Sequence, residues 1–458
     1  MTTLTGSSTV KVAILGGSAV ATPELVNAIK QTAHPLDIEL VLVSRHLDKL
    51  AVVARVAQLL AADPLPPSPF PLRGRSSGDV PAGTFQRGRS RDPRLSIAYT
   101  TDIEAALTEA NYVINQIRVG GLEARAFDES FPHDLGLPGE ETVGPGGFAN
   151  AYRTIPVVVA YARLMERLCP TAIMLNFANP SSLLQYALSR YTKVASIGLC
   201  NGPVMVSENI ARALGAAVDE LVVDYLGMHH FGWVTAVWRQ GRNLLPELLA
   251  KAAEVSWGVE PALVQAIGAL PGPYLNYVFH PDRLLAQKKG QRPRAEELIA
   301  LQDEILADYE QSAVAGLRPT ALARRKARWY ADIIAPVLLA LLEGGAPNRV
   351  PRFVLNVTNG QAIPWLPSEA VVEVPTILDH GQIRPLTTGA VPPEVKALLQ
   401  ANCAYEMLAV EAIVEQDRAK ALRALLLNPI IHTYDQAVGV LDRVWRQQRI
   451  DEINGLTN

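Results

Sequence analysis

The sequence predicts an α/β protein, with an N-terminal doubly wound (Rossmann-like) parallel sheet and a C-terminal mixed α/β domain. Three observations predict this class. Short β-branched runs alternate with helical stretches over roughly the first 200 residues. The first run is followed by a glycine turn and then by the start of a helix. Later in the chain, long amphipathic stretches and a β-rich piece replace the regular alternation.

The N-terminal part opens with a strand and a helix. The run 10–15 predicts the strand, and Thr22, Pro23 and Glu24 suit an N-cap, a first helical position and a first turn. Further strands are expected at 38–43, 112–115, 172–175 and 194–197, and helices at 155–168 and 181–189. This alternation favours a parallel sheet with helices on its faces.

The C-terminal part has longer elements. Helices are expected at 295–317, 322–342 and 393–423, and strands at 352–357 and 370–375. We therefore expect two domains, over 10–203 and over 204–445.

An insertion interrupts the first domain at about 62–94. It is rich in Pro, Gly, Ser and Arg, as in the runs 64–69 and 87–91. This composition is typical of a surface loop. The alternative is a basic lid or a segment that docks a partner.

The composition is that of a soluble globular enzyme. Of the 458 residues, 49% are hydrophobic and 19% are charged, and the net charge of -3 gives no electrostatic case for nucleic acid or an anionic membrane. Three widely spaced cysteines make no disulfide framework. Residues 1–9 lack the pattern of a signal peptide, and no apolar run reaches the roughly 18 residues that span a bilayer. We expect a cytoplasmic protein.

The glycine turn Gly16-Gly17-Ser18 lies between a strand and a helix. In that position backbone N–H groups can approach a pyrophosphate, although the G-x-G-x-x-G pattern is incomplete and a plain tight turn is the alternative. The second strand should end in an acid for the ribose hydroxyls, but Ser44 stands there, followed by Arg45. Ser44 can bind a ribose and Arg45 a 2′-phosphate, so both NAD and NADP stay open.

A thiol and an imidazole follow two apolar runs. Cys200 comes after the run 194–199, and His230 comes soon after the run 221–226. Each alone is more often an inert core residue, but as a pair they suit a divalent transition metal. The four protein ligands of a structural zinc site are not apparent, so a site open to substrate fits better.

Two tyrosines follow a Pro-Gly-Pro turn, at Tyr274 and Tyr277. Packing is the simpler explanation for such a pair. A tyrosine can also act as a base when a nearby cation lowers its pKa from about 10.

These segments resemble glycoside hydrolase family 4, the NAD- and metal-dependent glycosidases. The resemblance covers nearly the whole chain outside the insertion. It is carried by ten segments: Gly16–Ser18, Thr22–Leu25, Gln116–Arg125, Gly139–Phe148, Asn176–Pro180, Cys200–Pro203, His229–Trp233, Tyr274–Tyr277, Asn356–Gly360 and Val371–Pro375. The forms Cys-Asn-x-Pro and His-Phe-Gly-Trp are similar to the branch that includes 6-phospho-β-glucosidases.

The resemblance implies a role for several residues. Cys200 and His230 would bind Mn²⁺ or another divalent metal, and Tyr274 would be the catalytic base. Asn179 and Asn201 would hold sugar hydroxyls or the phosphate, with Asn201 also counted as catalytic. Two further groups complete the predicted site, namely Arg118 facing the substrate and the cofactor-binding residues Gly16, Gly17, Ser18 and Ser44. The first domain would then bind NAD, and the second the substrate and the metal.

The chemistry that the resemblance implies differs from that of ordinary glycosidases, which use two carboxylates. NAD⁺ would take hydride from C3 of the sugar, and the metal would acidify the proton on C2. Tyr274 would remove this proton, the aglycone would leave from C1, and water would add. Return of the hydride would make the net reaction a hydrolysis. The expected partner is a small glycoside or phosphoglycoside, and the family tends to form homodimers and homotetramers.

Some positions depart from the family pattern. Ser44 replaces an acid, His229 an asparagine and Asn276 an arginine, and Lys326-Ala327-Arg328 replaces a Gly-Gly-Ala run. A different or unphosphorylated glycoside is therefore one alternative. Two others are an NAD(P)-dependent 2-hydroxyacid dehydrogenase and a sugar-phosphate sensor with weakened catalysis.

Overall fold

The N-terminal strands form a parallel sheet in the order β3-β2-β1-β4-β5-β6. The structure is a computed structural model that describes residues 9–32, 34, 36–62, 95–343, 351–379 and 381–453. The strands are β1 (Val10–Leu15), β2 (Ile38–Val43), β3 (Leu95–Thr100), β4 (Tyr112–Asn115), β5 (Ile173–Asn176) and β6 (Ala195–Gly198). The helices between them are α1 (Pro23–Gln31), α2 (Leu47–Ala62), α3 (Ile103–Leu107), α4 (Gly121–Ser130), α5 (Gly144–Leu168), α6 (Ser181–Tyr191) and α7 (Gly202–Leu214). This is the strand order of a doubly wound dinucleotide-binding sheet, so the predicted fold class is confirmed.

Both faces of this sheet are buried. In β1, Val12 and Ile14 join one hydrophobic cluster, while Ala13 and Leu15 join another on the opposite face. Because successive strand side chains point to opposite faces, a strand covered on both sides needs a continuous apolar run. That requirement explains why the run 10–15 is apolar apart from Lys11, which is only partly buried.

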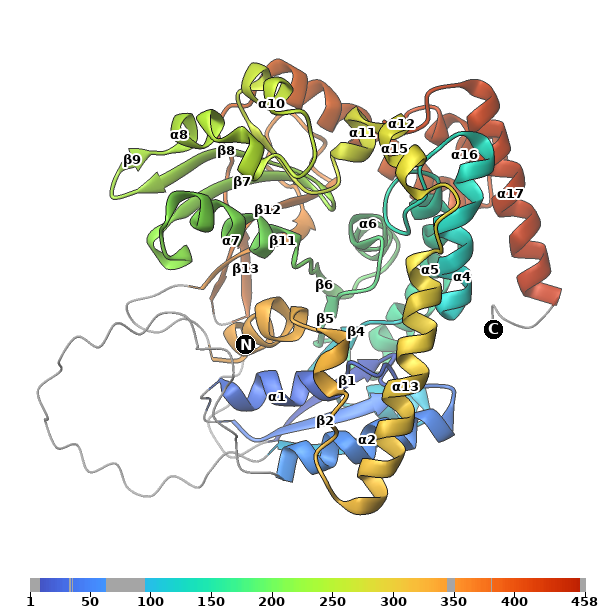
Figure 1. Cartoon of the computed structure of the whole chain (residues 1–458). Helices are drawn as coiled ribbons and strands as arrows, with labels where there is room; N and C mark the ends of the chain where they lie inside the picture. The colour runs from blue at the N-terminus through green and yellow to red at the C-terminus, as the bar shows by residue number, and fades with distance from the viewer. Residues whose placement is uncertain are drawn as a thin grey trace, which may run out of the picture.

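The second half extends the same sheet with antiparallel strands, in the order β10-β8-β7-β12-β11 (Figure 1). Its strands are β7 (Val222–Met228), β8 (Phe231–Arg239), β9 (Arg242–Asn243), β10 (Leu270–Pro271), β11 (Arg352–Thr358), β12 (Val371–Asp379) and β13 (Gln382–Pro385). Its helices are α8 (Leu245–Ala250), α9 (Ala252–Val255), α10 (Pro261–Ile267), α11 (Asn276–Phe279), α12 (Pro281–Lys288), α13 (Arg294–Ala315), α14 (Ala335–Glu343), α15 (Pro393–Glu415), α16 (Arg418–Leu425) and α17 (Tyr434–Ile453).

Two strand pairings in this region consist of one residue pair each, and the first of them joins the extension to the parallel sheet. β11 pairs with β6 at Asn356 and Gly198, and β12 pairs with β7 at Glu373 and Gly227. A buried network holds these strands together, because Glu373 accepts hydrogen bonds from Asn356 Nδ2 at 3.0 Å and from Tyr225 Oη at 2.8 Å. The network lies where the parallel and antiparallel parts meet, and the site described below is built beside it.

Helices from the second half also cover the first. Helix α13 packs against α2 and α4, and α15 packs against α5 and α6 (Figure 1). Among the described residues, α15 is long and apolar enough to cross a membrane, but half of its apolar window is buried within the fold. This burial is what a core helix of a globular domain shows.

Most predicted elements are present, with some changes of extent. Helix α5 begins at Gly144 rather than at 155, and the predicted helix 322–342 is divided into a 3₁₀ turn (Leu322–Arg325), a π-helical turn (Tyr330–Ile334) and α14. The predicted helix 393–423 breaks at Gln416, whose φ of 55° is left-handed. The insertion predicted at 62–94 lies outside the described residues apart from Ala62. The division into two domains at 203/204 stays a prediction, and the sheet continues across that point.

Candidate active site

Two histidines form the tip of the hairpin between β7 and β8. Met228 pairs with Phe231, which leaves His229 and His230 as a two-residue loop. His230 has a φ of 62°, a left-handed conformation that costs a residue with a Cβ about 1–2 kcal/mol. Such strain tends to persist at functional sites. The hairpin thus presents two imidazoles side by side.

Cys200 lies in the turn between β6 and α7. It is buried, and its Sγ accepts a hydrogen bond from the Gly202 N–H at 3.2 Å. Burial, with the carboxyl of Glu373 nearby, raises the pKa of this thiol well above its ordinary value. A cation beside the sulfur would act in the opposite direction and favour the thiolate.

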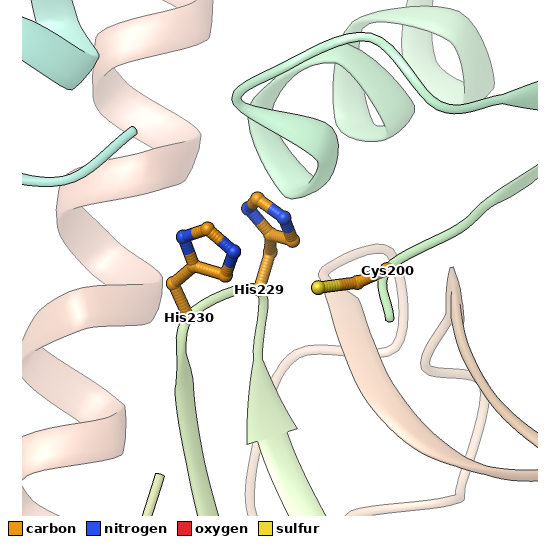
Figure 2. A group of neighbouring side chains, drawn as sticks. All are labelled: Cys200, His229 and His230. Atoms are coloured by element: carbon orange, nitrogen blue, oxygen red, sulfur yellow. The ribbon is translucent and has the colours of Figure 1, made fainter. Parts of the chain in front are cut away.

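The structure brings these three side chains together. Cys200 Sγ, one ring nitrogen of His229 and one ring nitrogen of His230 all lie within 4.8 Å of one another. Figure 2 shows the thiol pointing toward the two imidazoles at the hairpin tip. Cys200 and His230, which were predicted as a pair, therefore lie together. His229 was not predicted as a member of the cluster.

A threonine orients one of the imidazoles. The Thr142 hydroxyl lies 2.7 Å from His230 Nδ1 and donates to the carboxyl of Glu140, to which the Thr142 N–H also donates. With Glu140 ionised and accepting the hydroxyl proton, Nδ1 of His230 is the donor to the hydroxyl oxygen, which leaves Nε2 with its lone pair. Burial also lowers the pKa of His230 to about 3, so the ring is neutral at neutral pH. His230 is thus ready to act as a metal ligand.

Tyr274 covers the cluster. Its ring stacks on His230 with 3.8 Å between ring centroids and an interplanar angle of 7°. Burial raises the pKa of its phenol well above the ordinary value, and the nearby Glu140 adds to the effect. The phenol therefore keeps its proton until a cation is placed close to it. The predicted base and the predicted metal ligands share one site.

An ion-pair network lies beside the cluster. Arg118, which follows β4, pairs with Glu141, and Arg125 pairs with the same carboxylate at 2.8 Å. Burial would raise the pKa of Glu141, but the two arginines outweigh it and hold the pKa below its usual range. The side chain of Arg118 stays about one-third exposed (31%). Residues 140–142 thus connect Arg118 to His230.

The glycine turn lies at the switch point of the sheet, where the strand order reverses between β1 and β4. Gly16 has a φ of 80°, and a Cβ there would lie 2.9 Å from the carbonyl oxygen of Gln116. A Cβ on Gly17 would lie 2.8 Å from Leu42 Cβ. The turn is therefore held tightly between the neighbouring strands, at the crevice where doubly wound sheets bind dinucleotides.

Polar side chains line this turn. Ser18 Oγ and Ser44 Oγ are 2.7 Å apart, which joins the two serines predicted to bind the cofactor. Thr22 does occupy the N-cap of α1, but its side chain does not cap the helix. Its hydroxyl instead accepts a hydrogen bond from Gln116 Nε2 at 2.9 Å, across the crevice.

The two predicted asparagines begin helices. Asn201 directly follows Cys200 and is the N-cap residue of α7, whereas Asn179 precedes α6 through a cis bond to Pro180. Both are half-buried. Of the two, only Asn201 is next to a residue of the Cys200, His229 and His230 cluster in the chain.

Comparison with known proteins identifies the family. The model described as "Family 4 glycosyl hydrolase" matches residues 84–216, and that of the family's C-terminal domain matches residues 225–431. The chain belongs to glycosyl hydrolase family 4.

Family 4 relatives cover most of the chain. A probable 6-phospho-beta-glucosidase of Bacillus subtilis is 28% identical over 95% of both chains. A maltose-6'-phosphate glucosidase of the same organism is 31% identical over 75% of this chain and 80% of its own. The structure is similar to a Thermotoga maritima 6-phospho-beta glucosidase described with manganese, NAD+ and glucose-6-phosphate, with a TM-score of 0.81, 24% identity and coverage of 96% and 98%.

The residues present fit the two cofactors used by this family. A sulfur and two imidazole nitrogens suit a borderline divalent metal, and His229 Nδ1 is a buried atom without a hydrogen-bond partner. The tight turn at the switch point suits a dinucleotide. Sequence reasoning missed His229, Thr142 and Glu140. A hairpin signal was present, since two β-rich runs flank the pair His229-His230, but the loop lacks the usual glycine or asparagine.

Proposed function

We propose that this chain is an NAD- and divalent-metal-dependent glycosidase that hydrolyses 6-phospho-β-glucosides or closely related glycosides. One observation carries the proposal, which is the cluster of Cys200, His229 and His230 with Tyr274 stacked against it. A thiol, two imidazoles and a tyrosine do not form the carboxylate pair of an ordinary glycosidase. They suit a reaction in which a metal acidifies a C–H group of the substrate and a base removes its proton.

The cofactors and the residues of the cluster would have separate roles in the reaction. When bound, NAD⁺ would supply reversible hydride transfer and a divalent metal would supply a Lewis acid. Cys200 Sγ and His230 Nε2 would hold the metal. Tyr274 Oη would take the proton from C2 of the sugar, which lets the aglycone leave from C1 before water adds. Stacking on His230 fixes the plane of the Tyr274 ring and so orients its hydroxyl.

Other residues would bind and orient the substrate. Arg118 would face the sugar or its phosphate, and Glu141 restrains its guanidinium from behind. Asn179 and Asn201 would donate to sugar hydroxyls or to the phosphate, while Gly16, Gly17, Ser18 and Ser44 would line the dinucleotide crevice.

Two comparisons support a β-linked phosphoglucoside as the substrate class. The B. subtilis relative matched over 95% of this chain is named a 6-phospho-beta-glucosidase, whereas the maltose-6'-phosphate glucosidase is matched over 75%. The relative named as a probable β-acting enzyme is thus matched over more of this chain.

A substrate panel tests the proposal. Nitrophenyl α- and β-glucosides, each with and without a 6-phosphate, would be assayed with Mn²⁺ and with NAD⁺ or NADP⁺. We expect the fastest release of nitrophenol from the 6-phospho-β-glucoside, with a need for both cofactors and no net NADH. Faster cleavage of the α-anomer would overturn the β assignment. Stoichiometric NADH formation would favour a dehydrogenase.

A further inference from the structure

His229 is buried without a hydrogen-bonding role in the fold. Its side chain is 4% exposed, and its Nδ1 has no hydrogen-bond partner. Leaving a buried polar atom unpaired costs about 1–3 kcal/mol, so such an atom calls for an explanation.

The neighbours of this ring are the two predicted metal ligands. The rings of His229 and His230 stack with 3.8 Å between centroids, and a nitrogen from each lies within 4.8 Å of Cys200 Sγ. Ligands that share a tetrahedral metal lie about 3.4–3.6 Å apart, as follows from metal bonds of about 2.0–2.3 Å. The atoms of this cluster are held only to within 4.8 Å, so the side chains would have to move closer and the stacked rings to turn before they could share one ion.

We propose that His229 is a third protein ligand, so that this chain binds its metal through one thiolate and two imidazoles. The proposal rests on the proposed function, since it concerns the same metal. A structural histidine would be expected to hydrogen-bond through its ring nitrogens, as the Nδ1 of His230 does with Thr142. The unpaired Nδ1 of His229 instead matches a group that is satisfied by a metal.

A third soft or borderline ligand changes which divalent metals the site prefers. One sulfur and two nitrogens from the protein, with one position left for substrate or water, is the pattern of a catalytic zinc-type site. Oxygen-rich sites suit Mn²⁺, whereas imidazole and thiolate favour Co²⁺, Ni²⁺ and Zn²⁺. His229 should therefore contribute more to the binding of Co²⁺ than to the binding of Mn²⁺.

The test compares the variants His229→Asn, His229→Gln and Thr433→Ser, of which the last is a control at an exposed position. Co²⁺ affinity would be measured on the full chain by competition with a chromophoric chelator. The visible spectrum of the Co²⁺-loaded protein would report the number of ligands, and NAD⁺ binding would report an intact fold.

We expect both His229 variants to lose about 100-fold or more in Co²⁺ affinity, with a smaller loss for Mn²⁺ and an altered Co²⁺ spectrum. The control should bind as the unchanged protein does. Co²⁺ affinity within threefold of the control and an unchanged spectrum in either folded variant would overturn the proposal. If the unchanged protein bound no divalent metal, or if Cys200→Ser and His230→Asn had no effect on binding, the proposed function itself would fail.

Discussion

Thr142 determines which nitrogen of His230 is free to bind a metal. Its hydroxyl bridges His230 Nδ1 and the Glu140 carboxyl. We expect Thr142→Val to lower metal affinity about 10-fold or more, the usual effect of losing a group that orients a ligand. Thr142→Ser keeps the hydroxyl and should retain most of the affinity. Calorimetric titration with Mn²⁺ on both variants checks this, and equal affinities would contradict the proposed orientation.

The hydroxyl of Tyr274 is the proposed catalytic base, and its removal tests this role. Tyr274→Phe keeps the ring that stacks on His230 and removes only the hydroxyl. Turnover should fall at least about 100-fold, the usual contribution of a general base, while binding of the metal and of NAD⁺ changes little. Tyr277→Phe is the matched control, because Tyr277 lies near Tyr274 at 6.3 Å between ring centroids. A similar loss in both variants would indicate a packing role for Tyr274.

At the residue scale, the sequence predicts part of the site. Cys200 and His230 could be predicted because each follows an apolar run, and the structure does bring them together. His229 could not be assigned, since its role depends on an unpaired nitrogen that only the packing reveals. Thr142 is 88 residues from His230 in the chain, so no local pattern connects them.

The turn after β1 is the element that depends most on a single residue. A Cβ on Gly17 would lie 2.8 Å from Leu42 Cβ and 2.8 Å from the Val43 N atom. Gly17→Ala should therefore push the turn away from β2, at a cost of about 1–3 kcal/mol of stability and about tenfold in NAD⁺ affinity. Gly389→Ala, where a Cβ would meet nothing within 4 Å, is the control. Thermal melts and NAD⁺ titrations measure both effects, and an unaffected Gly17→Ala would show that the turn tolerates a side chain.

Helix α15 carries a buried carboxyl that makes stability depend on pH. Burial raises the pKa of Glu406 from 4.5 to about 8, against the hydrogen bond that Asn402 donates. Between these two pH values the unfolded chain is ionised while the folded chain keeps the proton. The contribution of Glu406 to the free energy of unfolding is therefore fully present below pH 4.5. It falls as pH rises toward 8, by at most about 1.4 kcal/mol per pH unit.

The variant Glu406→Gln removes this titration and keeps an acceptor for Asn402. Urea unfolding at several pH values should show that the variant gains stability relative to the unchanged protein as pH rises from 5 to 8. Glu394→Gln, at an exposed position of the same helix, should show no such trend. A difference for Glu406→Gln that does not vary with pH would contradict the raised pKa.

At the element scale, the strands are easier to predict than the helix boundaries. The predicted strands 10–15, 38–43 and 112–115 have the bounds of β1, β2 and β4, because strands buried on both faces are mostly apolar. The start of α5 was missed, since Gly144-Pro145-Gly146-Gly147 has the composition of a loop. Those residues are buried, and close packing rather than helix propensity determines their conformation.

At the scale of the whole molecule, the site is assembled from distant parts of one sheet. Cys200 follows a parallel strand, the two histidines end an antiparallel hairpin, and Thr142 and Tyr274 come from loops on either side. The parallel half could be predicted from its alternating pattern. The joint of β6 to β11 could not, because it pairs residues 158 positions apart through one contact, Gly198 to Asn356. The cytoplasmic location and the oligomeric state stay predictions.

The central claim is that hydrolysis passes through loss of the proton on C2, with NAD⁺ and a metal both required. The most direct measurement is to hydrolyse a 6-phospho-β-glucoside in deuterated water and to examine C2 of the released sugar phosphate by NMR. We predict deuterium at C2, no net NADH, and loss of both hydrolysis and exchange when the metal is chelated or NAD⁺ is removed. Hydrolysis that continues without either cofactor, and that leaves the original hydrogen on C2, would contradict the account.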